Sequence, residues 1–135
     1  MATAFNTAEL ISLTLPSTTA TTGVHATGTK IASVVMPYAG VITGVSVAVG
    51  TAPTGATFIV DVNIAGTTIY TTQANRPTIA IAGFSAVGGT AAANTFTAGQ
   101  VVTVDIDQIG SSEPGRNGSV HLLVDFAPTA ALVNA

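Results

Sequence analysis

The sequence has few side chains of the types that catalyse reactions or bind metals. Asp105 and Asp107 are two residues apart in a segment with the period of a strand, so their carboxylates should point to the same side and could share a hard cation. No further carboxylates cluster beside them, and we therefore expect a solvated strand face rather than a cation site. No acidic residue is marked by its spacing as the proton donor of a glycosidase: Asp61, Asp105, Asp107, Glu113 and Asp125.

The histidines and hydroxyl side chains also lack the neighbours that catalysis requires. His25 lies in a Thr-rich segment and His121 on the outward side of an expected strand, and we expect both to be ordinary polar residues. The segment from Gly23 to Lys30 differs from a phosphate-binding loop, because its lysine comes one residue late and a strand follows it. Cysteine is absent, and no serine or threonine has an evident base. The sequence therefore predicts no catalytic residue, no metal site, no cofactor and no enzymatic activity.

Scarcity of charge is the strongest feature of the composition. Charged residues make up 7% of the sequence, against about 25% in an average globular domain, while the apolar share of 47% is ordinary. With a net charge of −3 and a mean hydropathy of +0.61, a free monomer has little charge to keep it soluble. We expect part of the surface to be covered by protein neighbours. The basic residues do not cluster, so we expect no nucleic-acid partner: they are Lys30, Arg76 and Arg116.

The uncharged stretch 31–49 is long enough to raise the question of a membrane span. It contains Pro37, Gly40 and Gly44 among β-branched residues, and its alternation fits two consecutive strands better. We therefore expect no membrane partner. The first residues carry no positive charge before Glu9, so we expect synthesis and release in a cytoplasm rather than secretion.

Alternation with a period of two predicts strands along most of the chain. Residues 58–64 and 67–72 should form a tight hairpin, and residues 102–107 and 120–126 a second hairpin across an exposed loop. Residues 88–94 should lie in a long surface loop. In the strand over 41–49 one face should carry alternate residues, namely Val41, Thr43, Val45, Val47 and Val49.

These strands predict an all-β fold, a two-sheet antiparallel β-sandwich of about eight strands and preferably a jelly roll. We expect three parts: an N-terminal arm and Thr-rich linker over 1–24, a sandwich body over 25–127, and a short tail over 128–135.

Several segments carry a resemblance to a known class of protein. They are GVITGV at 40–45, FIVDVN at 58–63, GTTIY at 66–70 and VTVDIDQIG at 102–110. These strand and turn segments resemble those of the small β-sandwich structural proteins of tailed bacteriophages, and most of all those of the capsid decoration proteins. The resemblance implies a virion protein, made in the host cytoplasm, that sits on the outer capsid surface, often as a homotrimer. Its partners would be the major capsid protein or other virion subunits, and it would stabilise the shell by bridging capsomers.

The segment 9–15 is the part that we expect to contact a partner. It alternates like a strand and could add to a neighbouring sheet edge through Leu10, Ile11, Leu13 and Leu15. Removal of residues 1–16 should then weaken attachment and leave the body folded. The alternatives are a tail or fibre module that binds a host receptor or glycan through the loops 85–99 and 111–118, and a surface adhesin domain.

Overall fold

The computed structural model describes residues 7–17 and 23–127, and the remainder of the expected linker and the tail over 128–135 lie outside them. One short 3-10 helix, η1 (Gln73–Asn75), lies among the strands of this part of the chain. The strands in order are β1 (Thr7–Thr14), β2 (Gly28–Val35), β3 (Gly40–Ala48), β4 (Phe58–Ile64), β5 (Thr67–Thr68), β6 (Thr78–Ile79), β7 (Ser85–Val87), β8 (Thr95–Phe96), β9 (Val101–Gln108) and β10 (Ser119–Phe126).

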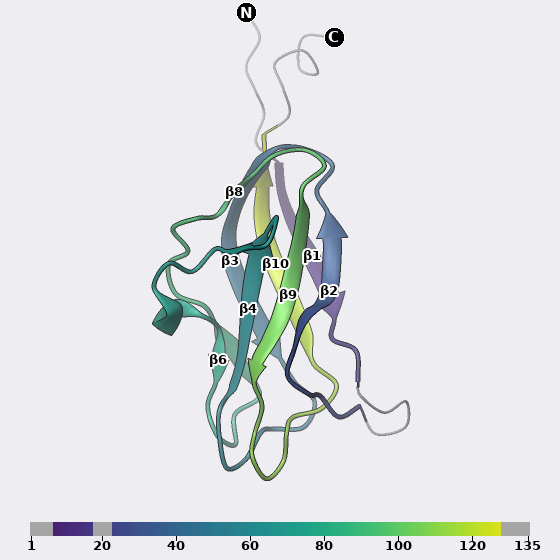
Figure 1. Ribbon diagram of the computed structural model, residues 1–135, viewed down its shortest axis with the longest axis vertical. Coiled ribbons are helices and arrows are strands. Elements are labelled where there is room, and N and C mark those ends of the chain that lie inside the picture. The colour runs from purple at the N-terminus through teal and green to yellow at the C-terminus, as the bar shows by residue number, and fades with distance from the viewer. Residues whose placement is uncertain (1–6, 18–22, 128–135) are drawn as a thin grey trace, which may run out of the picture.

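The strands form two antiparallel sheets that pack face to face (Figure 1). Sheet I has the order β1-β10-β3-β7, with β8 also paired to β3, and sheet II has the order β2-β9-β4-β5, with β6 also paired to β4. The chain passes from one sheet to the other at each step from β1 to β4. The predicted all-β, two-sheet antiparallel sandwich is therefore confirmed, and the jelly-roll form stays a prediction. No helix in the described part of the chain is long and apolar enough to span a membrane.

The core lies between the sheets and is made almost entirely of aliphatic and aromatic side chains. Alternate positions supply them: Val60 and Val62 of β4 and Val102 and Val104 of β9 are all fully buried. Phe96 and Phe126 pack edge to face at one end, with ring centroids 5.8 Å apart. Burial of this surface is the main stabilising term in a domain with so few ion pairs.

The N-terminal segment differs from the expected arm. β1 pairs with β10 along its whole length, from Thr7 opposite Phe126 to Thr14 opposite Ser119. Beyond its end, Leu15 is 3% exposed and belongs to the core. The boundary expected at residue 24 therefore does not separate β1 from the sandwich, and loss of residues 1–16 would remove an edge strand and a core side chain. The alternating pattern indicated a strand but could not show which chain supplies its partner.

A β-bulge changes the buried face of β3. The pairing of β10 with β3 shifts between Leu123 and Val124, whose partners are Gly44 and Ile42, so Thr43 is an extra residue. Before the bulge Ile42 is buried, and after it Val45, Val47 and Val49 are buried. The expectation that Val41 and Thr43 share one face with Val45, Val47 and Val49 is therefore wrong, because one inserted residue reverses the alternation.

The expected hairpin between residues 102–107 and 120–126 is also wrong. β9 belongs to sheet II and β10 to sheet I, so the loop 109–118 crosses between the sheets. Antiparallel bridges from Arg116 to Thr51 and from Glu113 to Thr54 hold this loop. Two strands with one apolar side each can pack across a core as well as side by side, and the alternation alone does not distinguish the two cases.

The hairpin of β4 and β5 is confirmed. Asn63 pairs with Thr68 and Ile64 with Thr67 around a two-residue turn. Both turn residues have positive φ, 50° at Ala65 and 87° at Gly66, as a type I′ turn requires. The region expected as a long loop contains the short strands β7 and β8, which pair with opposite ends of β3.

Candidate docking surface

The outer face of sheet I is almost free of charge. Pairing places Leu10 of β1 beside Leu123 of β10, and Leu123 beside Gly44 of β3. In the next row Val87 stands at the other edge. We define this outer face by its paired rows: Ala8, Leu10, Ser12, Thr14, Val41, Gly44, Ser46, Ala48, Ser85, Val87, Thr95, Ser119, His121, Leu123 and Asp125. Asp125 is the one residue among them with a formal charge at neutral pH.

Three large aliphatic side chains of the outer face are open to solvent. Leu10 is 63% exposed, Leu123 46% and Val87 77%. A hollow of about 250 Å³ lies among them, over Gly44. The hollow exists because Gly44, which is paired with Leu123, has no side chain to fill the space beside it. Exposed aliphatic side chains around a hollow, with almost no charge, are typical of a protein interaction surface.

The four residues expected to contact a partner are divided by the two sides of β1. Leu15 is buried in this chain's own core, and Ile11 and Leu13 are half-buried against it. Leu10 alone of the four lies on the outer face. A contact of this chain with a partner through β1 stays a prediction. In this conformation Leu10 is the one of the four side chains that is exposed and accessible to a partner.

His121 lies on the outer face between two serine hydroxyls. Its Nδ1 is 3.1 Å from Ser12 Oγ and its Nε2 is 3.0 Å from Ser119 Oγ. A serine nucleophile needs a histidine whose second nitrogen is oriented by an acid, and here both ring nitrogens contact hydroxyls. The arrangement ties β1 to β10 across the sheet. Sequence spacing could not reveal it, because Ser12 and His121 are brought together only by strand pairing.

The outer face of sheet II carries the exposed pair Val35 and Val101 at one end, and its carboxylates have partners within the chain. Asp105 accepts hydrogen bonds from the backbone N–H of Lys30 at 2.8 Å and from Asn63 Nδ2 at 2.9 Å. Asp107 forms an ion pair with Arg76 at 2.5 Å. The two carboxylates predicted to share a side are thus used separately. Among residues 7–17 and 23–127, no three His, Asp or Glu side chains are grouped so that they could hold a metal ion.

Asp61 lies on the side of β4 opposite to Val60 and Val62, but it is only 6% exposed. Its Oδ1 accepts hydrogen bonds from the backbone N–H of Val62 at 2.8 Å and from Thr68 Oγ1 at 2.7 Å. Burial raises the pKa of Asp61 above its ordinary value, and these two hydrogen bonds act against the rise. The charges of Asp107 and of Asp105, which faces Asp61 across the strand pair, raise the pKa a little further.

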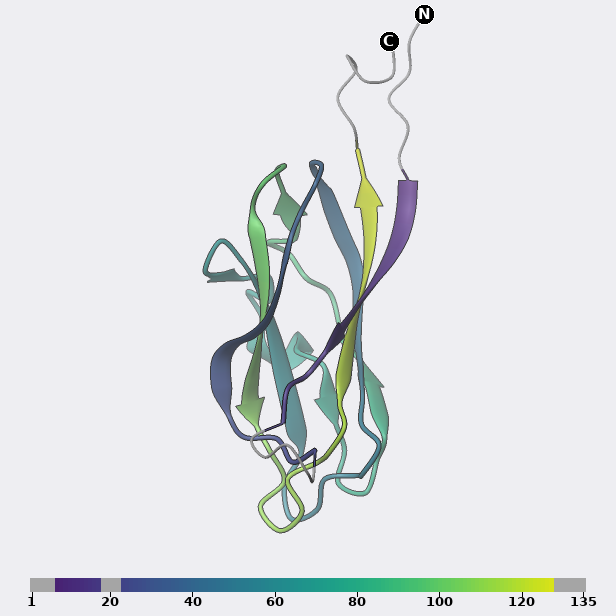
Figure 2. The ribbon, with the colours of Figure 1, turned by 90° about the vertical axis from the view of Figure 1, so that its right-hand side faces the viewer.

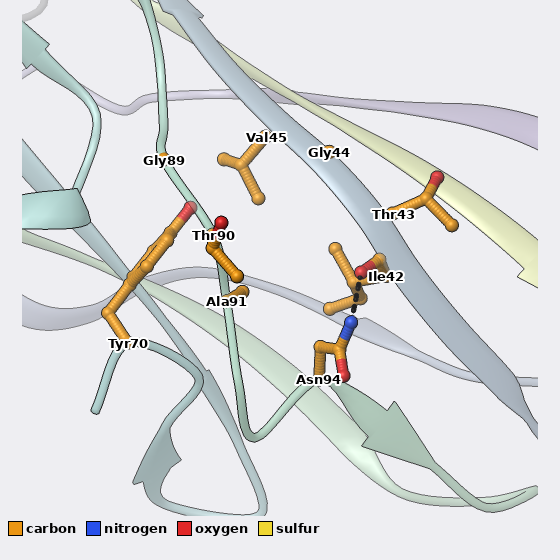
Figure 3. A pocket seen from close by; sticks show the side chains of 9 residues that line it. All are labelled: Ile42, Thr43, Gly44, Val45, Tyr70, Gly89, Thr90, Ala91 and Asn94. Carbon is orange, nitrogen blue, oxygen red and sulfur yellow. Dashed lines mark hydrogen bonds between the residues drawn. The ribbon is translucent and has the colours of Figure 1, made fainter. Parts of the chain in front are cut away.

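A second hollow, of about 180 Å³, lies at the edge of β3 between the segments that pair β7 and β8 (Figure 3). Ile42 and Val45 line one side and Tyr70 the other. Asn94 also lines the hollow, and its side-chain amide already donates a hydrogen bond from Nδ2 to the carbonyl of Ile42 at 2.9 Å. Burial raises the pKa of Tyr70 far above its ordinary value, so the phenol stays neutral. None of the residues that line this hollow carries a charge, so it offers no charged group to a ligand.

His25 was expected to be an ordinary polar residue, and its position in the core was missed. Its side chain is 1% exposed and packs against Phe58, with ring centroids 5.7 Å apart. Nδ1 is 3.0 Å from the carbonyl oxygen of Pro16. Burial lowers the pKa of His25 below 6.5, and the bond to Pro16 opposes this. Because its Nε2 also accepts from the backbone N–H of Gly118, His25 links the chain after β1 to the loop before β10.

Comparison with known proteins identifies a shared fold. No protein-family model and no curated protein matches the sequence. A solved structure described as the acidic stable capsid structure of Helicobacter pylori bacteriophage KHP30 contains a chain that superposes with a TM-score of 0.53 at 16% identity. The match covers 96% of this chain and 95% of that chain. Because the match covers nearly the whole of both chains, the two share an overall fold rather than one motif.

Proposed function

We propose that this chain is a structural subunit of a bacteriophage virion that binds the outer surface of the capsid and stabilises the shell by bridging capsomers. The proposal gives it no enzymatic turnover. It would be made in the host cytoplasm and contact the major capsid protein or other virion subunits. The fold shared with a chain of a phage capsid structure supports this role over the full length of the chain.

The observation that carries the proposal is the outer face of sheet I. Leu10, Leu123 and Val87 surround a hollow on a face with one formal charge. The ion pairs lie elsewhere, between Arg76 and Asp107 and between Arg116 and Glu113. A shell protein that buries the outer face therefore loses little favourable hydration of charge and gains the hydrophobic contribution of the aliphatic side chains.

A matched pair of substitutions tests this face. Val87→Asp places a carboxylate on the outer face of sheet I, and Val35→Asp places one on sheet II at a position that is also mostly exposed. Binding of each variant is measured on capsid shells of the phage that encodes the chain, after removal of the native subunit. Val87→Asp should raise the dissociation constant at least about tenfold, because a buried unpaired charge costs more than about 1.4 kcal/mol, and Val35→Asp should leave it unchanged.

Equal binding of the two variants would refute the outer face as the docking surface. Imaging of purified virions supplies the second criterion. Copies distributed over the head surface support the capsid role, and copies confined to the tail replace it with the tail or fibre module.

A further inference from the structure

The two sheets end in edge strands of very different kinds. β5 and β6 at one edge of sheet II, and β7 and β8 at one edge of sheet I, are two or three residues long. Short edge strands offer little backbone for another chain to pair with. The other two edges, β1 in sheet I and β2 in sheet II, are eight residues long and lie on the same side of the sandwich (Figure 2).

β2 is interrupted in the way that protects an edge. Its pairing with β9 breaks between Gly28 and Ala32, and Lys30 has a φ of 53°. The backbone N–H of Lys30 turns to the carboxylate of Asp105. A lysine in a bulge is a common feature of edges that do not accept another strand.

β1 has no such protection. It pairs with β10 through eight consecutive residues without a register shift, and none of these residues has positive φ. Glu9 is its one charged residue. No described residue pairs with its other edge. The backbone N–H of Leu15 donates to the carbonyl of Gly118, so alternation directs the N–H and C=O groups of the even-numbered residues away from β10: Ala8, Leu10, Ser12 and Thr14.

We propose that this free edge pairs antiparallel with β1 of a second copy, about a two-fold axis at Ile11. In this register Leu10 opposes Ser12 of the second copy, and both present their free backbone groups to each other. Glu9 opposes Leu13, so the pairing brings no two like charges together. A second copy fits because every strand pair of this fold is antiparallel and a two-fold contact is self-complementary.

The pairing does not depend on the capsid role, but it would serve it. In the dimer, sheet I of one copy and sheet I of the other would form one continuous sheet, with both outer faces on the same side. A dimer of this form would present two hollows to the shell at once.

Leu10→Pro removes the outward N–H at the centre of the proposed contact and leaves the bonds to β10 intact, and proline is tolerated at such edge positions. Leu10→Ala removes the side chain and keeps the N–H. Sedimentation of the full chain should give a dimer for the wild type and for Leu10→Ala, and a dissociation constant at least tenfold higher for Leu10→Pro. The thermal unfolding of Leu10→Pro verifies that the sandwich is folded.

Cross-linking tests the register. The chain has no cysteine, so Ile11→Cys introduces a single thiol on the two-fold axis, and oxidation should convert it to a disulfide-linked dimer. Ser33→Cys on β2 is the control and should remain monomeric on a denaturing gel. A wild-type monomer or trimer, or equal dimerisation of Leu10→Pro, overturns the proposal. If the wild type is monomeric and Leu10→Pro binds shells more weakly than Leu10→Ala does, the edge belongs to a strand of the shell protein instead.

Discussion

The ring nitrogen Nε2 of His25 accepts a hydrogen bond from the backbone N–H of Gly118 at 2.8 Å. A backbone N–H can only donate, so Nε2 carries no proton and Nδ1–H must donate to Pro16. The fold therefore requires the neutral imidazole. Protonation would set two donors against each other where the end of β1 and the start of β10 meet.

His25 should make stability depend on pH. Its pKa is lowered in the folded state, so the unfolded chain binds more protons below about pH 6.5 and stability falls as the pH falls, by at most about 1.4 kcal/mol per unit. His25→Gln can accept from Gly118 and donate to Pro16 without titrating. The free energy of unfolding in urea at about pH 5 and about pH 7.5 should differ less in this variant than in the wild type.

The raised pKa of Asp61 acts in the opposite direction, since its ionisation costs stability as the pH rises, but it is common to both proteins. A wild-type slope in His25→Gln would contradict the role of His25.

Two leucines of the N-terminal segment should differ sharply in their contribution to stability. Leu15→Ala removes a core side chain and should cost about 2–5 kcal/mol. Leu10→Ala removes an exposed side chain and should change stability by less than about 0.5 kcal/mol. Urea unfolding of the two variants measures both values, and similar losses would mean that β1 is not placed as described.

Thr103 should tolerate the loss of its hydroxyl. Thr103 Oγ1 is buried and has no hydrogen-bond partner, so Thr103→Val keeps the shape and removes an unsatisfied group. Stability should stay equal or rise by about 1 kcal/mol. Thr68→Val is the contrast, because the hydroxyl of Thr68 donates to Asp61 and its loss should cost about 1–3 kcal/mol. A loss of that size in Thr103→Val would show that its hydroxyl is bonded.

Two glycines with positive φ separate backbone strain from crowding. At Gly66, with φ 87°, an added Cβ meets no atom within 4 Å, and Gly66→Ala should cost about 1–2 kcal/mol. At Gly115, with φ 104°, the Cβ would lie 3.1 Å from Cδ2 of Phe58 in the core. Gly115→Ala should therefore lose more stability in the same unfolding experiment. Equal losses would indicate that the loop moves away from Phe58 at no cost.

The inward faces of the regular strands could be predicted because alternation shows which side chains point to the core. Val60, Val62, Val102 and Val104 lie in the core as their spacing indicated. The bulge at Thr43 could not be predicted, because an extra residue leaves no mark on the residue types around it. The partners of β9 and β10 could not be predicted either, since alternation identifies a buried side and not the neighbouring strand.

The candidate site was harder to predict than the fold. Leu10 was named among the contact residues, but Leu123 and Val87 join it on the outer face only through pairing across β1, β10, β3 and β7. His25 gave no signal, because its partners are backbone groups of Pro16 and Gly118, which any residue type could supply. The burial of Asp61 could not be predicted either, because Thr68, whose hydroxyl donates to it, is brought beside it only by the pairing of β4 with β5.

The pairing of Thr7 with Phe126 has a mechanical consequence. β1 and β10 run antiparallel, so the start of β1 and the end of β10 lie together at one end of the sandwich (Figure 1). Tension that pulls these two strand ends apart breaks the backbone hydrogen bonds between β1 and β10 one pair at a time. Tension applied over the outer face of a sheet is shared by many contacts at once. The subunit therefore resists mechanical strain best when its partner holds the outer face of a sheet, and least when force acts on the start of β1 and the end of β10.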